Sequence, residues 1–175
     1  MYRIKLTPFT QKTPYQKLSV ILKFLIDDEK LAKSLTDLEK IYNIKLSELQ
    51  KKNFLSSDIK RIRITKPSGK PDALILQKIK TDDINTDYFR NHLAAFVANL
   101  QSEVTRNLYI TIPSFSIVKK YFDSKEYYYQ TFAEGVLLGN YSFDKYKKEQ
   151  EKDKTLNVYL HPEDEKILRT ALKKA

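Results

Sequence analysis

Residues 134–147 read EGVLLGNYSFDKYK and carry the most specific pattern in the chain. Gly135 and Gly139 stand four residues apart, so on a helix both lie on one face and let another backbone approach closely. Glycine is scarce, with 3 in 175 residues against a usual share of about 7%. A helical glycine destabilises by about 1 kcal/mol relative to alanine. We therefore expect this pair to serve close packing.

Strand and helix patterns alternate on either side of this stretch. Apolar runs predict strands, two of them forming a hairpin around the turn sequence at 67–72: residues 2–6, 18–26, 59–64, 73–77, 107–112 and 156–160. Amphipathic spacing and capping residues predict helices: one capped by Asp27 or Asp28 and running past Leu38, one from a cap at 82–87 to Val104, one over 124–141, and one opened by Pro162 and ending at Lys174. The alternation predicts a single α/β domain over 1–175, with a mixed sheet and helices on its faces.

Composition excludes several classes of protein. The absence of cysteine excludes a disulfide scaffold, a thiolate metal site and a cysteine nucleophile. With only 2 histidines, a histidine-based zinc site is not expected. No apolar run approaches the roughly 18 residues of a membrane span, and the first residues lack a signal-peptide pattern. We expect a cytoplasmic protein without membrane partners. The net charge of +10 permits attraction to nucleic acid.

The stretch at 134–147 resembles the signature that ends the N-terminal domain of cytosol (leucyl) aminopeptidases. Eight defined positions of E-G-x-x-L-G-x-Y-x-F-x-x-Y-K match: Glu134, Gly135, Leu138, Gly139, Tyr141, Phe143, Tyr146 and Lys147. The resemblance implies a three-layer α/β/α, macro-domain-like fold. The close-packing glycines and the aromatic cluster suit a seam between domains, so we take these eight residues as the candidate interdomain and structural signature.

The same resemblance implies a non-catalytic domain that packs on and positions a C-terminal catalytic domain missing from this chain. In the family that domain binds two divalent metals, zinc or manganese, and removes N-terminal residues from peptides, and the full-length enzymes are hexamers. By itself this chain would then be no enzyme and would hold no cofactor. Residues 144–155 form a charged loop, and 156–175 a last strand and helix leading towards the absent domain. We favour truncation over a naturally short protein.

Two short stretches match the beginning of metal-binding sequences, but neither match is long enough to indicate a metal site. Asn85-Thr86-Asp87 opens like the family's metal motif but continues as Tyr88-Phe89-Arg90, so we interpret it as a helix cap. Ala133-Glu134-Gly135 belongs to the helix signature. The Gly-rich turn that many members carry after the strand at 74–76 is replaced by 77–80, which contain no glycine. That change disfavours a phosphate cradle, although a small-ligand macro domain stays open as a third reading.

A basic hairpin supports the alternative function of a nucleic-acid-binding module. Residues 51–80 carry nine basic and two acidic side chains, a net charge of +7. Arg61 and Arg63 alternate with isoleucines and so face one side of their strand. The candidate anion-binding residues are Lys60, Arg61, Arg63, Lys66 and Lys70. The other interpretation is a solvated strand face whose charges discourage edge pairing.

Three further features have ordinary structural interpretations. His92 on the amphipathic helix is interpreted as a packed histidine. His161 beside the acidic turn at 163–165 is interpreted as a neighbour of first-turn carboxylates, which helix electrostatics favour, and not as a metal ligand. Tyr127-Tyr128-Tyr129 places at least one ring outward, where it could stack on a base or meet a partner domain.

Overall fold

A computed structural model describes residues 2–9, 15–56, 59–65, 71–100, 105–141 and 154–175. Its elements are, in chain order, β1 (Tyr2–Pro8), β2 (Ser19–Ile26), α1 (Leu31–Ile41), α2 (Glu48–Leu55), β3 (Arg61–Thr65), β4 (Ala73–Ile79), the 3₁₀ turn η1 (Thr81–Asp83), α3 (Tyr88–Leu100), β5 (Asn107–Thr111), α4 (Phe115–Val118), the 3₁₀ turn η2 (Lys119–Tyr121), α5 (Lys125–Asn140), β6 (Lys154–His161) and α6 (Glu165–Ala171). The predicted alternation of strands and helices is confirmed.

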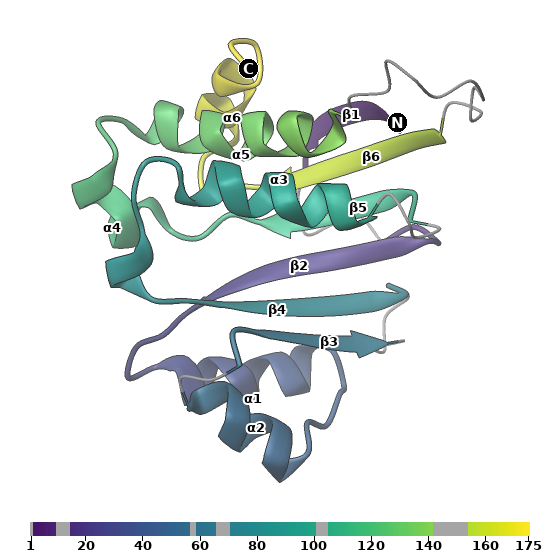
Figure 1. The fold of residues 1–175 in the computed structure, drawn as a ribbon, viewed down its shortest axis with the longest axis vertical. Coiled ribbons are helices and arrows are strands. Elements are labelled where there is room, and N and C mark those ends of the chain that lie inside the picture. Colours follow the sequence, from purple (N-terminus) through teal and green to yellow (C-terminus); the bar gives the residue numbers. More distant parts are fainter. Residues whose placement is uncertain (1, 10–14, 57–58, 66–70, 101–104, 142–153) are drawn as a thin grey trace.

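The six strands form one mixed sheet in the order β1-β6-β5-β2-β4-β3. All neighbours pair in parallel except β3, which pairs antiparallel with β4 as the predicted hairpin. Helices α3 and α5 run side by side over the sheet, while α1 and α2 lie near its β3 edge (Figure 1). The carboxyl ends of β2, β4 and β5 lie together, towards the left in Figure 1. The predicted α/β fold with a mixed sheet is therefore present.

Two apolar cores lie on opposite faces of the sheet and make the three layers. One joins alternate sheet residues to α3, α5 and α6, and the aromatic rings of Phe89, Tyr128 and Phe132 in it are fully buried. The other joins the intervening sheet residues to α1, α2 and Phe9. Strand β4 is buried on both faces, as expected for a strand covered by helices on each side. The stripe on α3 predicts its buried face correctly up to Leu100.

Three details of the expected boundaries are corrected. Helix α6 begins at Glu165 and not at Pro162, because the Asp164 carboxylate caps it by accepting from the Ile167 N–H at 3.1 Å. Helix α1 has Lys30 at its N-cap, and Asp28 instead accepts from the Lys30 N–H at 2.9 Å. Strand β6 starts at Lys154, so the expected charged loop loses its last two residues to the sheet. The rest of that loop lies outside the described residues.

Candidate interdomain face

The two glycines of the signature bring α5 against the backbone of α3. A Cβ added at Gly135 would lie 2.6 Å from the Arg90 carbonyl oxygen. One added at Gly139 would lie 2.8 Å from the Ala94 Cα and 2.8 Å from the Val97 Cβ, with the Ala94 carbonyl oxygen closer still. The expected close approach is confirmed, but its partner is a helix of the same domain. The glycines therefore do not themselves form the expected seam with another domain.

Glu134 is also held inside the domain. Its Oε2 accepts from the Arg90 Nε at 2.7 Å and lies 2.6 Å from the Arg90 Nη2, while its Oε1 accepts from the Gln130 amide at 2.7 Å. Arg90 further contacts the Asp87 carboxylate, and its Nη2 lies 3.5 Å from the Tyr127 hydroxyl. These bonds tie α5 to the first turn of α3. The signature glutamate thus orients the two glycine-packed helices.

The other described signature residues point away from this contact. Leu138 is 54% exposed and Tyr141 is 69% exposed, and Leu137 beside them is 38% exposed. With Glu134 and Ala175 they line an open hollow of about 320 Å³. We call Leu137, Leu138 and Tyr141 the α5 apolar patch. Phe143, Tyr146 and Lys147 lie outside the described residues.

The basic hairpin places its arginines as expected on one side of β3, with Ile62 buried on the other. Arg61 is engaged within the domain: its Nε donates to the Gln77 Oε1 at 2.8 Å and its guanidinium lies 5.4 Å from the Phe96 ring. Lys60 lies 3.5 Å from Asp83. Lys66 and Lys70 lie outside the described residues. Arg61 therefore packs on α3, and nothing in this arrangement adds support for a nucleic-acid interface.

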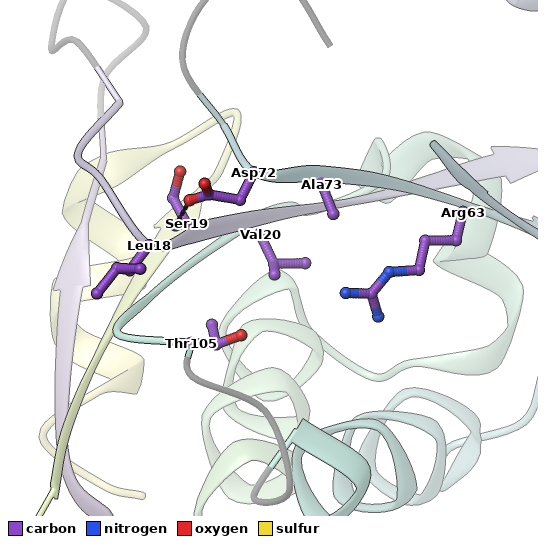
Figure 2. Close-up of a pocket in the computed structure, with 7 residues that line it drawn as sticks. All are labelled: Leu18, Ser19, Val20, Arg63, Asp72, Ala73 and Thr105. Atoms are coloured by element: carbon purple, nitrogen blue, oxygen red, sulfur yellow. Dashed lines mark hydrogen bonds between the residues drawn. The ribbon is translucent and has the colours of Figure 1, made fainter. Parts of the chain in front are cut away.

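Arg63 lies at a second, smaller hollow. It extends towards Val20 and Thr105 across a cavity of about 210 Å³ that Leu18, Ser19, Asp72 and Ala73 also line (Figure 2). The Ser19 N–H donates to the Asp72 carboxylate at 2.8 Å, which ties β2 to the start of β4. The hollow lies at the amino ends of these two parallel strands, opposite the edge where open α/β sheets bind ligands.

His92 is the packed histidine that the sequence predicts. Its Nε2 accepts from the Arg61 Nη2 at 3.1 Å, and its ring stacks on Tyr88 with 5.8 Å between centroids. Because arginine can only donate, this bond requires the neutral imidazole. Burial, and then the Arg61 charge, lower the pKa of His92 to about 4.

A pH-dependent stability follows from this histidine. Below pH 6.5 His92 binds a proton in the unfolded chain but not in the folded chain. The free energy of unfolding that depends on His92 is therefore fully present above pH 6.5 and falls as the pH drops towards 4. For this half-buried side chain we expect a loss of about 2 kcal/mol. Urea unfolding at several pH values should show a His92→Gln variant losing correspondingly less than the wild type over this range. Equal losses in the two proteins would contradict the assignment.

Sequence reasoning missed that Lys78, one of the nine basic residues counted at 51–80, is buried in β4. Lys78 is 2% exposed, and its Nζ donates to the carbonyl oxygens of Phe54 and Ser56, each at 2.6 Å. Asp27 lies 3.9 Å away. The glycine-free segment at 77–80 is therefore a continuation of the strand up to Ile79, and its lysine fastens the end of α2 to the sheet. Apart from strand alternation, no signal in the sequence marks this residue.

The described residues contain no group of three or more His, Cys, Asp or Glu that could hold a metal ion. Asn85 caps the turn that leads into α3: its side-chain oxygen accepts from the Asp87 N–H at 3.0 Å, in line with the capping role interpreted from the sequence.

Tyr128 and Tyr129 are fully buried, and Tyr127 is the half-buried ring of the three. Within the described part of the chain, no helix is long and apolar enough to cross a membrane.

Comparisons with solved structures show the fold. A mutant of tomato leucine aminopeptidase matches 98% of this chain with a TM-score of 0.60 and 15% identity. The bottromycin maturation enzyme BotP matches 89% with a TM-score of 0.51 and 14% identity. The chain spans 35% of the first of these structures and 29% of the second. A search of curated proteins finds no match.

The sequence match is more specific than the structural one. The profile described as "Cytosol aminopeptidase family, N-terminal domain" matches residues 20–150, which is most of the chain. The match covers the sheet from β2 to β5 and the glycine-packed helix α5, and it extends past the whole signature. The structural matches agree with it in fold. This chain therefore belongs to the cytosol aminopeptidase family and comprises its N-terminal domain.

Proposed function

We propose that this chain is the non-catalytic N-terminal domain of a leucyl-aminopeptidase-like metallo-exopeptidase, and that it packs on and positions a C-terminal catalytic domain. Family membership supports the assignment. The described residues do not fit a metal centre, so the two divalent ions, zinc or manganese, would belong to the catalytic domain. We also propose that the protein is cytoplasmic and that the full-length enzyme is a hexamer, as the family resemblance implies.

The observation that carries the proposal is the α5 apolar patch. Two leucines in the last turn of α5 and the tyrosine that follows this helix, all within the family signature, are exposed around a hollow of about 320 Å³. Exposed apolar groups gathered beside a hollow mark interaction surfaces more often than scattered ones do. Ala175 lines the same hollow, so the end of the described chain lies at the patch. A domain that follows in the sequence would begin beside it.

The test uses the full-length enzyme with Leu138→Glu and Tyr141→Ser combined. A carboxylate placed in a desolvated contact should weaken the packing of the two domains by about 2–4 kcal/mol. We expect lower thermal stability of the catalytic half and at least a tenfold loss of leucyl-peptide kcat/KM. The isolated 175-residue chain should keep its own stability, because both side chains are exposed.

A matched control is available on a distant helix. Leu49 of α2 is 67% exposed and lies away from the α5 apolar patch, so Leu49→Glu adds the same charge at a site with no proposed contact. It should leave both activity and stability unchanged. If the double variant behaves like this control, the patch does not contact the catalytic domain.

A further inference from the structure

Three polar side chains form a row across neighbouring strands on the face that carries α1. Lys23 of β2 pairs with Thr111 of β5, which pairs with His161 of β6. Partners in a parallel sheet project to the same face, and adjacent strands lie about 4.8 Å apart. Lys23 and His161 therefore flank Thr111 and can converge over it. All three residues are partly exposed, so a ligand could reach them.

Aromatic residues enclose this row. The Lys23 Nζ lies 5.6 Å from the centre of the Tyr42 ring, and the His161 ring packs edge-on against Phe9 at 6.1 Å. One row deeper on the same face, Tyr109 and Tyr159 stack with 4.6 Å between their centroids. The polar groups are thus set on an apolar aromatic floor, which lowers the local dielectric and strengthens their interaction with a charged ligand.

The row lies where the connections of neighbouring strands diverge. Helix α1 follows β2 and packs on the face that carries the row, whereas α5, which follows β5, packs on the opposite face. Adjacent parallel strands whose connections leave to opposite faces have a crevice outside their carboxyl ends, where open α/β sheets bind ligands. β5 ends at Thr111 and β6 ends at His161. The row therefore lies at that edge of the sheet.

The charge at the row is not balanced by the described residues. No carboxylate among them lies within ion-pair distance of Lys23, and Asp27, the acid at the end of its strand, is directed to Lys78 instead. Burial lowers the pKa of Lys23, and burial together with the Lys23 charge lowers that of His161. A partly buried cation without a counterion is unfavourable, and a bound anion would offset that cost.

We propose that Lys23, Thr111 and His161 bind an oxyanion, the phosphate or carboxylate group of a small ligand. The Lys23 ammonium supplies charge, and the Thr111 hydroxyl and a His161 ring N–H supply hydrogen bonds. The site belongs to this domain alone and does not depend on the proposed contact with a catalytic domain. The glycine-free segment at 77–80, which continues β4 up to Ile79, takes no part in it.

The experiment titrates the 175-residue chain with inorganic phosphate and, separately, with acetate. Ionic strength is held constant with sodium chloride, because a chain of net charge +10 attracts any anion. We expect saturable changes in the amide NMR signals of residues 23, 111 and 161 with at least one of the two anions. The anion that binds more tightly identifies the ligand group. Absence of saturable changes with both would overturn the proposal.

Variants assign the binding to the row. Lys23→Met keeps the apolar stem and removes the desolvated charge, so it should be more stable than the wild type without anion and should bind it at least tenfold more weakly. His161→Asn gives an independent test and should also weaken binding. The control Lys33→Met removes an exposed charge on α1 and should change nothing. Wild-type affinity in both row variants, or an equal loss in the control, would overturn the proposal.

Discussion

Replacing Gly139 with alanine should destabilise the domain, although alanine is the better helix former. The added Cβ would lie 2.8 Å from the Ala94 Cα and closer still to the Ala94 carbonyl oxygen. Backbone atoms cannot rotate away as a side chain can, so α3 and α5 must separate along their contact. Overpacking of this kind costs about 1–3 kcal/mol or more, against a helix-propensity gain of about 1 kcal/mol. We expect a net loss of about 2 kcal/mol, measured by urea unfolding.

Two companion variants sharpen this test. Gly135→Ala meets the Arg90 carbonyl oxygen at 2.6 Å, a contact less tight than that at Gly139, so its loss should be smaller. Leu138→Ala changes an exposed side chain next to Gly139 and should stay within about 0.5 kcal/mol of the wild type. If Gly139→Ala proved as stable as Leu138→Ala, the close approach of the two helices would be refuted.

Replacing Lys78 with methionine should also destabilise the fold. Methionine preserves most of the buried stem but leaves the Phe54 and Ser56 carbonyl oxygens without their donor. Removing a charged donor from buried acceptors costs about 1.5–3 kcal/mol per bond, and losing the ammonium's burial penalty offsets part of that. We expect a net loss of about 2–3 kcal/mol in urea unfolding.

The location of the damage distinguishes this prediction from general destabilisation. Amide hydrogen exchange should quicken first in α2, because Lys78 holds the end of that helix to β4. Lys60→Met is the matched control: Lys60 is 62% exposed, and its only described ion pair, to Asp83, spans 3.5 Å. That control should lose less than about 0.5 kcal/mol. A Lys78→Met protein with unchanged stability and exchange would show that the lysine is not a structural fastening.

The strongest local patterns predict their elements well. Six apolar positions on the stripe of α3 predict a helix, and the five within the described residues are buried. The turn sequence between β3 and β4 and their alternation predict the hairpin, whose register is observed. The ends of helices are predicted less well: Asp164 and not Pro162 starts α6, because β6 continues to His161 and delays the turn. Caps depend on where the preceding strand ends, and sheet pairing decides that.

For the candidate sites, too, the sequence predicts some features and only the tertiary structure shows others. The signature at 134–147 identifies the family and predicts that its glycines pack closely, but only the tertiary structure shows that α3 is their partner. That partner lies more than forty residues earlier in the chain, and no local pattern specifies it. The exposure of Leu138 and Tyr141, by contrast with the buried glycines of the same helix, follows from that packing.

By itself the sequence determined the α/β class, most of the strands and helices, and the family, because each rests on periodicity or on a motif within some fifteen residues. Tertiary structure alone decided that Lys78 is buried under the end of α2 and that Lys23, Thr111 and His161 share one row. The physical reason is register. Which residues of distant strands become neighbours depends on the pairing of the whole sheet, and that pairing is the sum of many weak contacts along it.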